Sequence, residues 1–208
     1  MRRIEKRPQE PHELLEYRKS GGTKYEGFPY KDGLRQPLVE DQGALCCYCM
    51  RRICAGDMKV EHYRSQSRHP EQQLEWSYLL GACKGGEGGP PRDQTCDTRK
   101  ADADITIDPM TTSVERLRYP PDGRIICDDT VVQQDLDDRL NLNHEELKRG
   151  RRAALTGFKE GLVRRLGSER KWQRRTLEHE IHSLRGDKPF KEYVALLEYW
   201  LRKQVERR

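Results

Sequence analysis

Residues 44–67 read ALCCYCMRRICAGDMKVEHYRSQS, and the interpretation of the whole chain depends on this stretch. It contains a Cys-x-x-Cys motif at Cys46 and Cys49, a spacing that lets two thiolates bind one tetrahedral zinc ion from a turn. A Glu-His pair, Glu61 and His62, follows the motif. Two interpretations are open. Either a zinc knuckle has an unrelated histidine nearby, or the knuckle exists to hold the histidine in place.

The composition favours a modest core covered by charged helices. Of 208 residues, 34% are apolar and 36% are charged, and a chain that buries little apolar surface often needs a metal or a partner for stability. No segment approaches the roughly 18 apolar residues of a membrane span, and the basic N-terminus lacks the apolar stretch of a secretory signal. We therefore expect a cytoplasmic protein without membrane contact, whose seven cysteines serve as metal ligands before disulfides.

A tetrahedral zinc site needs a second pair of cysteines. Cys83 ends an apolar segment at a glycine-rich loop, and Cys96 begins an expected helix, so this pair would close the loop between them. Cys54 and Cys127 fit better as small buried residues. We predict a structural zinc ion held by four thiolates, those of Cys46, Cys49, Cys83 and Cys96.

The residue after the fourth cysteine adds an acid to the Glu-His pair. Asp97 begins the same expected helix, so one zinc ion would anchor both Asp97 and the strand that carries Glu61 and His62. Two carboxylates on separate elements suit a hard divalent cation, and His62 beside them would act as general base. Arg99 and Lys100 add positive charge for a substrate phosphate. Neighbouring side chains on a strand face opposite ways unless the chain bends, and a bend at Glu61 and His62 would let Glu61 reach a metal while His62 points at a water.

Elsewhere the pattern predicts mainly helices. Helices are expected over residues 11–19 and 36–42, two short strands around a tight turn at 55–57, an apolar segment at 74–83, and a hairpin over 116–127. From about residue 134 onward the pattern is helical. Its last segment has an apolar stripe typical of a helix that faces a core, formed by Phe190, Tyr193, Val194, Leu197 and Leu201.

Six segments occur together in a specific order: MRRIEKR, DQGALCCYCMRRI, MKVEHYRSQS, LLGACKG, TCDTRKAD and LNLNHEELKRGRRAAL. This combination resembles the HNH nuclease family and its ββα-metal fold, and more narrowly the HNH proteins of Septu-type and retron-associated anti-phage systems. The resemblance covers roughly residues 1–155. It implies an α+β protein with a zinc-stabilised HNH core at 44–110, a helical and loop extension at 1–43, and a hairpin followed by a basic helical region at 111–208.

The resemblance also implies roles for individual residues. His62 would activate water as the general base, and Glu61 and Asp97 match the positions that bind the catalytic Mg²⁺ or Mn²⁺, zinc being structural only. The family often has His or Asn where this chain has Asp97. It usually has Asn where this chain has Tyr78, and a tyrosine supplies no amide, so either a neighbour such as Ser77 substitutes or the histidine is oriented differently.

The activity that the resemblance implies is hydrolysis of phosphodiester bonds in nucleic acid, with DNA favoured and RNA possible. The implied partner is an ABC/SMC-like ATPase in a hetero-oligomer. Two other functions stay open. The chain could be a zinc-stabilised nucleic-acid reader with impaired catalysis, which Tyr78 favours, or an adaptor whose main task is docking to the ATPase.

The basic residues are concentrated near the C-terminus. Residues 144–208 carry 18 Lys and Arg against 10 Asp and Glu, a net charge of +8, whereas the other 143 residues have a net charge of −3. This asymmetry favours contact with a polyanion, through side chains such as Arg164, Arg165, Lys171, Arg174 and Arg175, although a solvated helical face has the same pattern. The HEIH segment at 179–182 lacks the four-residue spacing of a metalloprotease motif and is predicted to be helix surface.

Overall fold

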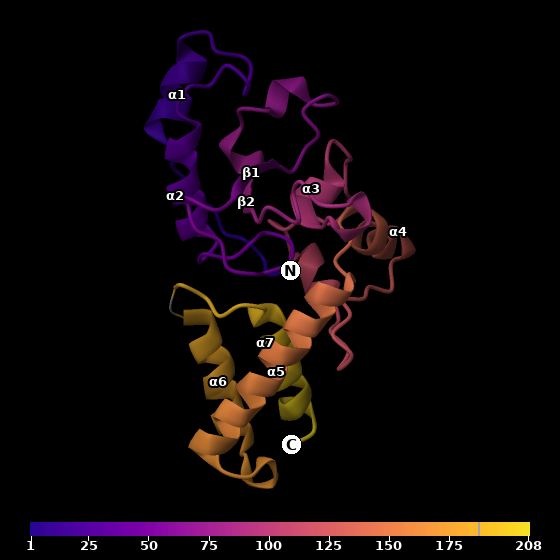
Figure 1. Cartoon of the computed structure of the whole chain (residues 1–208). Coiled ribbons are helices and arrows are strands. Elements are labelled where there is room, and N and C mark those ends of the chain that lie inside the picture. Colours follow the sequence, from indigo (N-terminus) through magenta and orange to yellow (C-terminus); the bar gives the residue numbers. More distant parts are fainter. Residues whose placement is uncertain (187) are drawn as a thin grey trace.

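A computed structural model describes residues 1–186 and 188–208 (Figure 1). The fold is mixed, with helices around one small antiparallel sheet, in agreement with the predicted α+β class. The α-helices are α1 (His12–Lys19), α2 (Lys31–Asp41), α3 (Cys96–Lys100), α4 (Thr130–Gln134), α5 (Glu145–Leu166), α6 (Arg174–Gly186) and α7 (Val194–Glu206). Short 3-10 turns lie at Pro70–Gln72, Trp76–Tyr78, Pro91–Asp93, Thr112–Arg116 and Glu169–Lys171, and a π-helical turn at Asp135–Arg139 continues α4.

The sheet pairs two strands that are distant in sequence. Strand β1 (Lys59–His62) runs antiparallel to β2 (Leu79–Ala82), with His62 opposite Leu79. This corrects the expectation that the strand at 59–62 pairs across the turn at 55–57. That turn is closed by a single bridge between Cys54 and Asp57. The apolar β2 is buried along its whole length, so it offers β1 a larger apolar contact than the charged knuckle does.

The knuckle packs against β2 through close backbone contacts. The Cys47 amide donates to the Gly81 carbonyl at 3.0 Å, and the Gln42 side chain bonds both the amide and the carbonyl of Gly81. A Cβ at position 81 would lie 3.0 Å from Ile53 and Met58 side-chain atoms, so the absence of a side chain permits this approach. The zinc knuckle and the sheet are therefore one packed unit.

The predicted N-terminal helix at 11–19 is confirmed as α1, but the helix expected at 36–42 begins earlier, at Lys31. Pro37 lies inside α2, and the Gly33 carbonyl consequently lacks the amide that would bond it. After α2, Gly43 adopts φ +60° and the Phe190 ring packs directly on it, so that an added Cβ would lie 2.2 Å from the ring. Gly43 thus joins the N-terminal half to the chain segment before α7.

The C-terminal helices form a second packed group, in which α6 packs against α7 and α5 crosses α7 (Figure 1). The predicted apolar stripe is confirmed as core, since all five side chains are at most 8% exposed. Two of its members, Phe190 and Tyr193, precede α7 and are not helical. Their amides donate to the carbonyls of Gly43 and Met50, at 3.0 and 3.1 Å, which fixes the helical group to the knuckle.

The hairpin predicted over 116–127 is reduced to one bridge between Arg118 and Ile126. Residues 1–7 run between the two packed groups, where the Ile4 amide donates to Pro109 and Arg7 pairs with Asp41 at 2.7 Å. Within the described residues, we find no helix whose length and apolar character would let it cross a membrane. The domain boundaries drawn at 43/44 and 110/111 stay predictions.

Candidate active site

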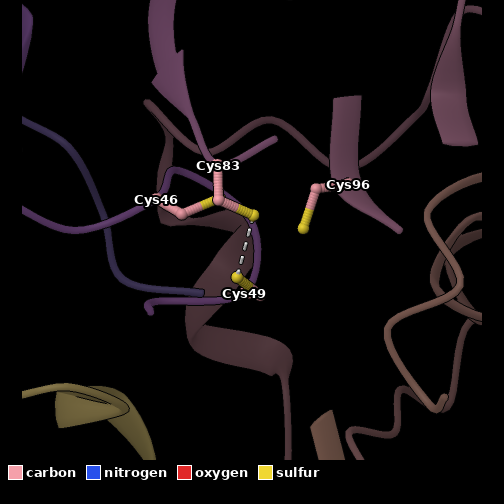
Figure 2. Close-up of side chains that lie close together, drawn as sticks. All are labelled: Cys46, Cys49, Cys83 and Cys96. Atoms are coloured by element: carbon pink, nitrogen blue, oxygen red, sulfur yellow. Dashed lines mark hydrogen bonds between the residues drawn. The ribbon is translucent and has the colours of Figure 1, made fainter. Parts of the chain in front are cut away.

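The four predicted zinc ligands lie together in the structure. Their sulfur atoms are all within 4.8 Å of one another, and Figure 2 shows them directed toward a common centre. Cys46 and Cys49 come from the knuckle, Cys83 directly follows β2, and Cys96 begins α3. The sulfurs of Cys49 and Cys83 are 3.7 Å apart, close to the edge of about 3.8 Å in a tetrahedron with Zn–S bonds of about 2.3 Å.

The charge state of these thiols also suits a metal. Burial raises the pKa of Cys46, and contact with Cys46 raises those of Cys49 and Cys96. The pKa of Cys83 is lowered because the other three thiols hydrogen-bond to it, and the Arg51 guanidinium lies 3.8 Å from its sulfur. A cation at the centre would let all four thiols ionise, and buried thiolates in a tetrahedron are the donor set that zinc prefers. The cluster could therefore hold a zinc ion.

The remaining cysteines lie outside this cluster. Cys127 is buried, as expected of a small apolar residue, and so is Cys47. Cys54 was expected to be buried but is exposed, and it lies at the turn that its bridge to Asp57 closes.

The structure brings the side chains of Glu61 and Asp97 into contact. Glu61 is 1% exposed, and its Oε1 accepts hydrogen bonds from the Tyr48 hydroxyl at 2.6 Å and from the Lys100 ammonium at 2.9 Å. Asp97 Oδ2 lies 2.8 Å from the Lys59 ammonium. Each carboxyl is thus paired with a lysine, and both pairs lie between β1 and α3.

The two carboxyls have opposite pKa shifts. Burial raises the pKa of Glu61, and its hydrogen bond with Asp97 raises it further. Burial also opposes ionisation of Asp97, but the hydrogen bonds from Glu61 and Lys59 outweigh it, so that the pKa of Asp97 is lowered. Of the two acids, Glu61 is therefore the one that takes up a proton more readily, and Asp97 is the stronger acid.

Glu61 and Asp97 could together bind a hard divalent cation if the ion pair between Asp97 and Lys59 were broken. Adjacent carboxylate oxygens from two elements are ligands that Mg²⁺ and Mn²⁺ accept. The Lys100 side chain is 1% exposed and fixed, whereas the Lys59 side chain is 31% exposed and reaches Asp97 from the solvent side. Displacement of the Lys59 ammonium would open Asp97 to a cation, with Glu61 behind it.

His62 is the last residue of β1, so its side chain leaves the strand on the face opposite to that of Glu61. The chain bends only after His62, at residues 63 and 64. The His62 ring is 8% exposed, its Nε2 lies 3.1 Å from the Gln73 carbonyl oxygen, and the Tyr25 ring packs edge-on against it at 4.4 Å. Since a carbonyl only accepts, Nε2 carries the proton and Nδ1 keeps its lone pair. Burial lowers the pKa of His62 to about 4, so the ring is neutral at pH 7.

The other predicted site residues have intramolecular partners. Tyr78 uses its backbone carbonyl, which accepts from the Tyr63 amide at 2.9 Å and extends the β1–β2 ladder. The Arg99 guanidinium donates to the carbonyls of Pro91 and Asp138, both at 3.0 Å. Lys100 also donates to the His62 carbonyl at 2.9 Å. To contact a phosphate, Arg99 and Lys100 would have to give up these intramolecular hydrogen bonds. Their predicted phosphate contacts stay predictions.

Four residues at this site were not found from the sequence. Lys59 lies two positions before Glu61, and the period of two along a strand could have placed it on the same face. Tyr48 lies between the two knuckle cysteines, where its contact with Glu61 depends on the turn. Tyr25 and Gln73 come from irregular segments, and no periodic pattern indicates that they meet at His62.

The basic side chains of the C-terminal helices are at the surface. Arg165 and Arg174 pair with glutamates of α6, and the residues left as possible polyanion contacts are exposed, namely Arg164, Lys171 and Arg175. His179 and His182 are exposed on α6, as predicted for a helix surface.

Comparison with known proteins gives one informative similarity. No protein-family model matches the chain. The chain is 27% identical over 149 residues to the Septu protein PtuB of Bacillus thuringiensis. The aligned part is 66% of this chain and 53% of the relative, so the chain spans about half the length of the curated relative it matches.

Proposed function

We propose that this chain is a metal-dependent endonuclease of the HNH type and an effector of a Septu-type anti-phage defence system. The similarity to the Septu protein PtuB supports the defence role. The observation that carries the nuclease proposal is the contact between Glu61 and Asp97. Asp97 lies in α3, which begins at Cys96 of the four-cysteine cluster, and Glu61 lies in β1, which pairs with the strand that precedes Cys83. A structural zinc ion in that cluster would hold the two acids together.

The chemistry can be assigned to individual side chains. His62 accepts a proton from the attacking water at Nδ1, because its Nε2–H is bonded to the Gln73 carbonyl. A Mg²⁺ or Mn²⁺ ion held by Glu61 and Asp97 would supply charge stabilisation at the scissile phosphate. Lys100 fixes Glu61 and the His62 backbone through one buried ammonium. The substrate is nucleic acid, with DNA favoured and RNA possible.

The test compares His62→Ala with a matched control, His69→Ala. His69 lies in the same loop region but pairs with Asp104 at 3.6 Å instead of Gln73. Zinc-loaded proteins are incubated with plasmid DNA or total RNA and with Mg²⁺ or Mn²⁺, alone and with the partner ATPase. We expect wild type and His69→Ala to cut and His62→Ala to be inactive at equal zinc content. Equal cutting by His62→Ala would contradict the role of His62.

A second function has a specific observation in its favour. Both acids are paired with lysines, which is the arrangement expected of a zinc-stabilised nucleic-acid reader or adaptor without catalysis. Binding of nucleic acid by wild type, with no cleavage under any of the conditions above, would favour this function.

The Septu resemblance supports an ABC/SMC-like ATPase as partner, with docking on the C-terminal helices. Deletion of α7 would expose its buried stripe, so substitution is the better test. Val163 on α5 is a large apolar side chain that is 42% exposed, and Val131 on α4 is a matched control at 52%. We expect Val163→Asp to reduce co-purification with the ATPase and Val131→Asp to leave it unchanged. Equal retention of the ATPase by both variants would remove α5 as the docking site.

A further inference from the structure

A groove with a volume of about 480 Å³ lies between the two packed groups. Its walls come from residues 1–5, from the segment around 114–119, and from α6 and α7. None of the candidate nuclease residues lines it. The volume is in the range of small-molecule sites, which is about 300–1,000 Å³.

The groove has a surplus of guanidinium groups. Glu198 is 9% exposed and is approached by three arginines, with Arg2 at 2.6 Å, Arg185 at 3.0 Å and Arg202 at 3.8 Å. One carboxylate balances the charge of one arginine, so this cluster keeps two positive charges. Arg3 also lines the groove and is exposed, and no ion pair of Arg3 is found in the part of the chain that the structure describes.

The remaining charges at the groove do not cancel this surplus. Lys188 adds a further positive charge, and its ammonium is bonded to the carbonyls of Glu40 and Asp41. The carboxylate of Asp41 is already paired with Arg7, while those of Glu5 and Glu115 are exposed to solvent. A ligand in the groove therefore meets arginine side chains around a neutralised, buried glutamate, which favours an anion.

The apolar part of the lining is aromatic. The Arg2 guanidinium stacks over the Phe190 ring at 4.0 Å, and Tyr119 and Tyr199 form an edge-to-face pair with centroids 5.9 Å apart. All three rings line the groove. Aromatic faces and arginine planes are the surfaces on which nucleic-acid bases stack.

We propose that this groove binds a nucleoside monophosphate, either free or as the 5′-phosphorylated end of a nucleic-acid strand. The phosphate pairs with Arg3, Arg185 and Arg202, and the base lies against the tyrosine pair. The site is separate from the carboxyl pair at α3, so the proposal holds whether or not the chain cleaves nucleic acid. Because the groove lies between the two packed groups, its ligand would bridge them.

Isothermal titration of the full, zinc-loaded chain with AMP tests the site. We expect saturable binding of one AMP per chain with a Kd below about 1 mM. Adenosine and inorganic phosphate, titrated separately, should each bind more weakly than AMP, because each offers only one half of the recognised chemistry. Absence of saturable AMP binding would overturn the proposal, and phosphate binding as tight as that of AMP would remove the base from it.

Variants locate the binding to the groove. Arg3→Gln and Arg202→Gln should each weaken AMP binding by about tenfold, because each removes a charged hydrogen-bond donor. Arg207→Gln is the matched control, an exposed arginine at the end of α7 that does not line the groove. Ala195→Trp should block the groove without a change of charge. Equal affinities in all four variants would place AMP elsewhere and overturn the proposal.

A final arm distinguishes the two sources of the ligand. A short single-stranded oligonucleotide is compared with and without a 5′ phosphate, in competition with AMP. A phosphorylated strand that binds the groove more tightly than AMP identifies a strand end as the ligand. A phosphorylated strand that binds equally or more weakly identifies the free nucleotide. Equal competition by both strands would show that the 5′ phosphate is not recognised and would exclude the strand end as the ligand.

Discussion

The Lys100 ammonium lies 2.9 Å from the Glu61 carboxylate, and both side chains are 1% exposed. Removal of one partner leaves the other buried without its counter-charge, which typically costs about 3–5 kcal/mol. We expect Lys100→Met to lower the free energy of unfolding by about 3 kcal/mol in urea titrations of the zinc-loaded protein.

The control for this prediction is Lys19→Met. Lys19 pairs with Glu16 at 3.0 Å, but both side chains are at least half exposed, so Lys19→Met should lower the free energy of unfolding far less than Lys100→Met. Similar losses for Lys100→Met and Lys19→Met would show that the buried pair contributes no more than a surface pair. The double variant Lys100→Met with Glu61→Gln should recover part of the lost stability, because it removes both charges.

The Lys59 ammonium occupies the solvent side of Asp97, where a divalent cation would bind. Lys59→Met removes that competing charge, so we expect the affinity for Mn²⁺ to rise by about tenfold or more. Electron paramagnetic resonance of free Mn²⁺ measures this without any nuclease activity. Lys84→Met is the control. The Lys84 ammonium lies 2.8 Å from Asp57 in a similar ion pair, which involves neither Glu61 nor Asp97. An equal rise in both variants would reflect net charge alone.

The Tyr25 ring supports His62, and the Tyr25 amide donates to the Gln73 side chain at 2.9 Å. Tyr25→Ala should release the imidazole and lower the cleavage rate by about tenfold or more, because misplaced catalytic groups lose rate steeply. Tyr25→Phe keeps the ring and should retain activity. Nitrogen-15 spectra of the His62 ring provide a second measurement, in which Tyr25→Ala should give mixed tautomers. A single unchanged tautomer in Tyr25→Ala would contradict the positioning role of Tyr25.

The sequence predicted the parts of the site that depend on spacing. The Cys-x-x-Cys turn, the helix that begins at Cys96 and the apolar segment before Cys83 are local patterns, and the four sulfurs lie within 4.8 Å of one another once these elements meet. The predicted pairing of the strand at 59–62 across the turn at 55–57 was wrong. This strand pairs instead with the apolar strand at 79–82, which follows an irregular loop. The support of His62 by Gln73 and Tyr25 could not be predicted, since a backbone carbonyl and an irregular N-terminal segment leave no residue pattern.

The four-cysteine cluster predicts which cysteine substitutions lower the zinc content of the protein. Cys96→Ser should abolish zinc binding and destabilise the fold strongly, because the ion would link the knuckle, β2 and α3. Cys54→Ser is the control, since Cys54 is exposed and outside the cluster. Zinc per chain, measured by atomic emission on proteins purified without chelator, should be one in wild type and Cys54→Ser. One zinc per chain in Cys96→Ser would exclude Cys96 as a ligand.

Lys6 gives the protein a pH dependence of stability that can be isolated. Its ammonium is bonded to the carbonyls of Trp76 and Leu79 and lies 3.4 Å from the centre of the Trp76 ring. Burial lowers the pKa of Lys6 from 10.5 to about 7. Between these pH values the unfolded chain binds more protons than the folded chain, so stability from this group rises with pH. Below pH 7 the full cost of burying the charge is present, and above 10.5 it has disappeared.

Lys6→Met removes this contribution at every pH. The free energy of unfolding of wild type, relative to Lys6→Met, should therefore increase from pH 7 to pH 10 by on the order of 3 kcal/mol, which allows for partial exposure of the amine. Urea titrations of both proteins across this range measure the difference, and ionisation of the cysteines and tyrosines cancels between them. Parallel pH profiles would mean that Lys6 keeps an ordinary pKa, with its ammonium solvated in the folded protein.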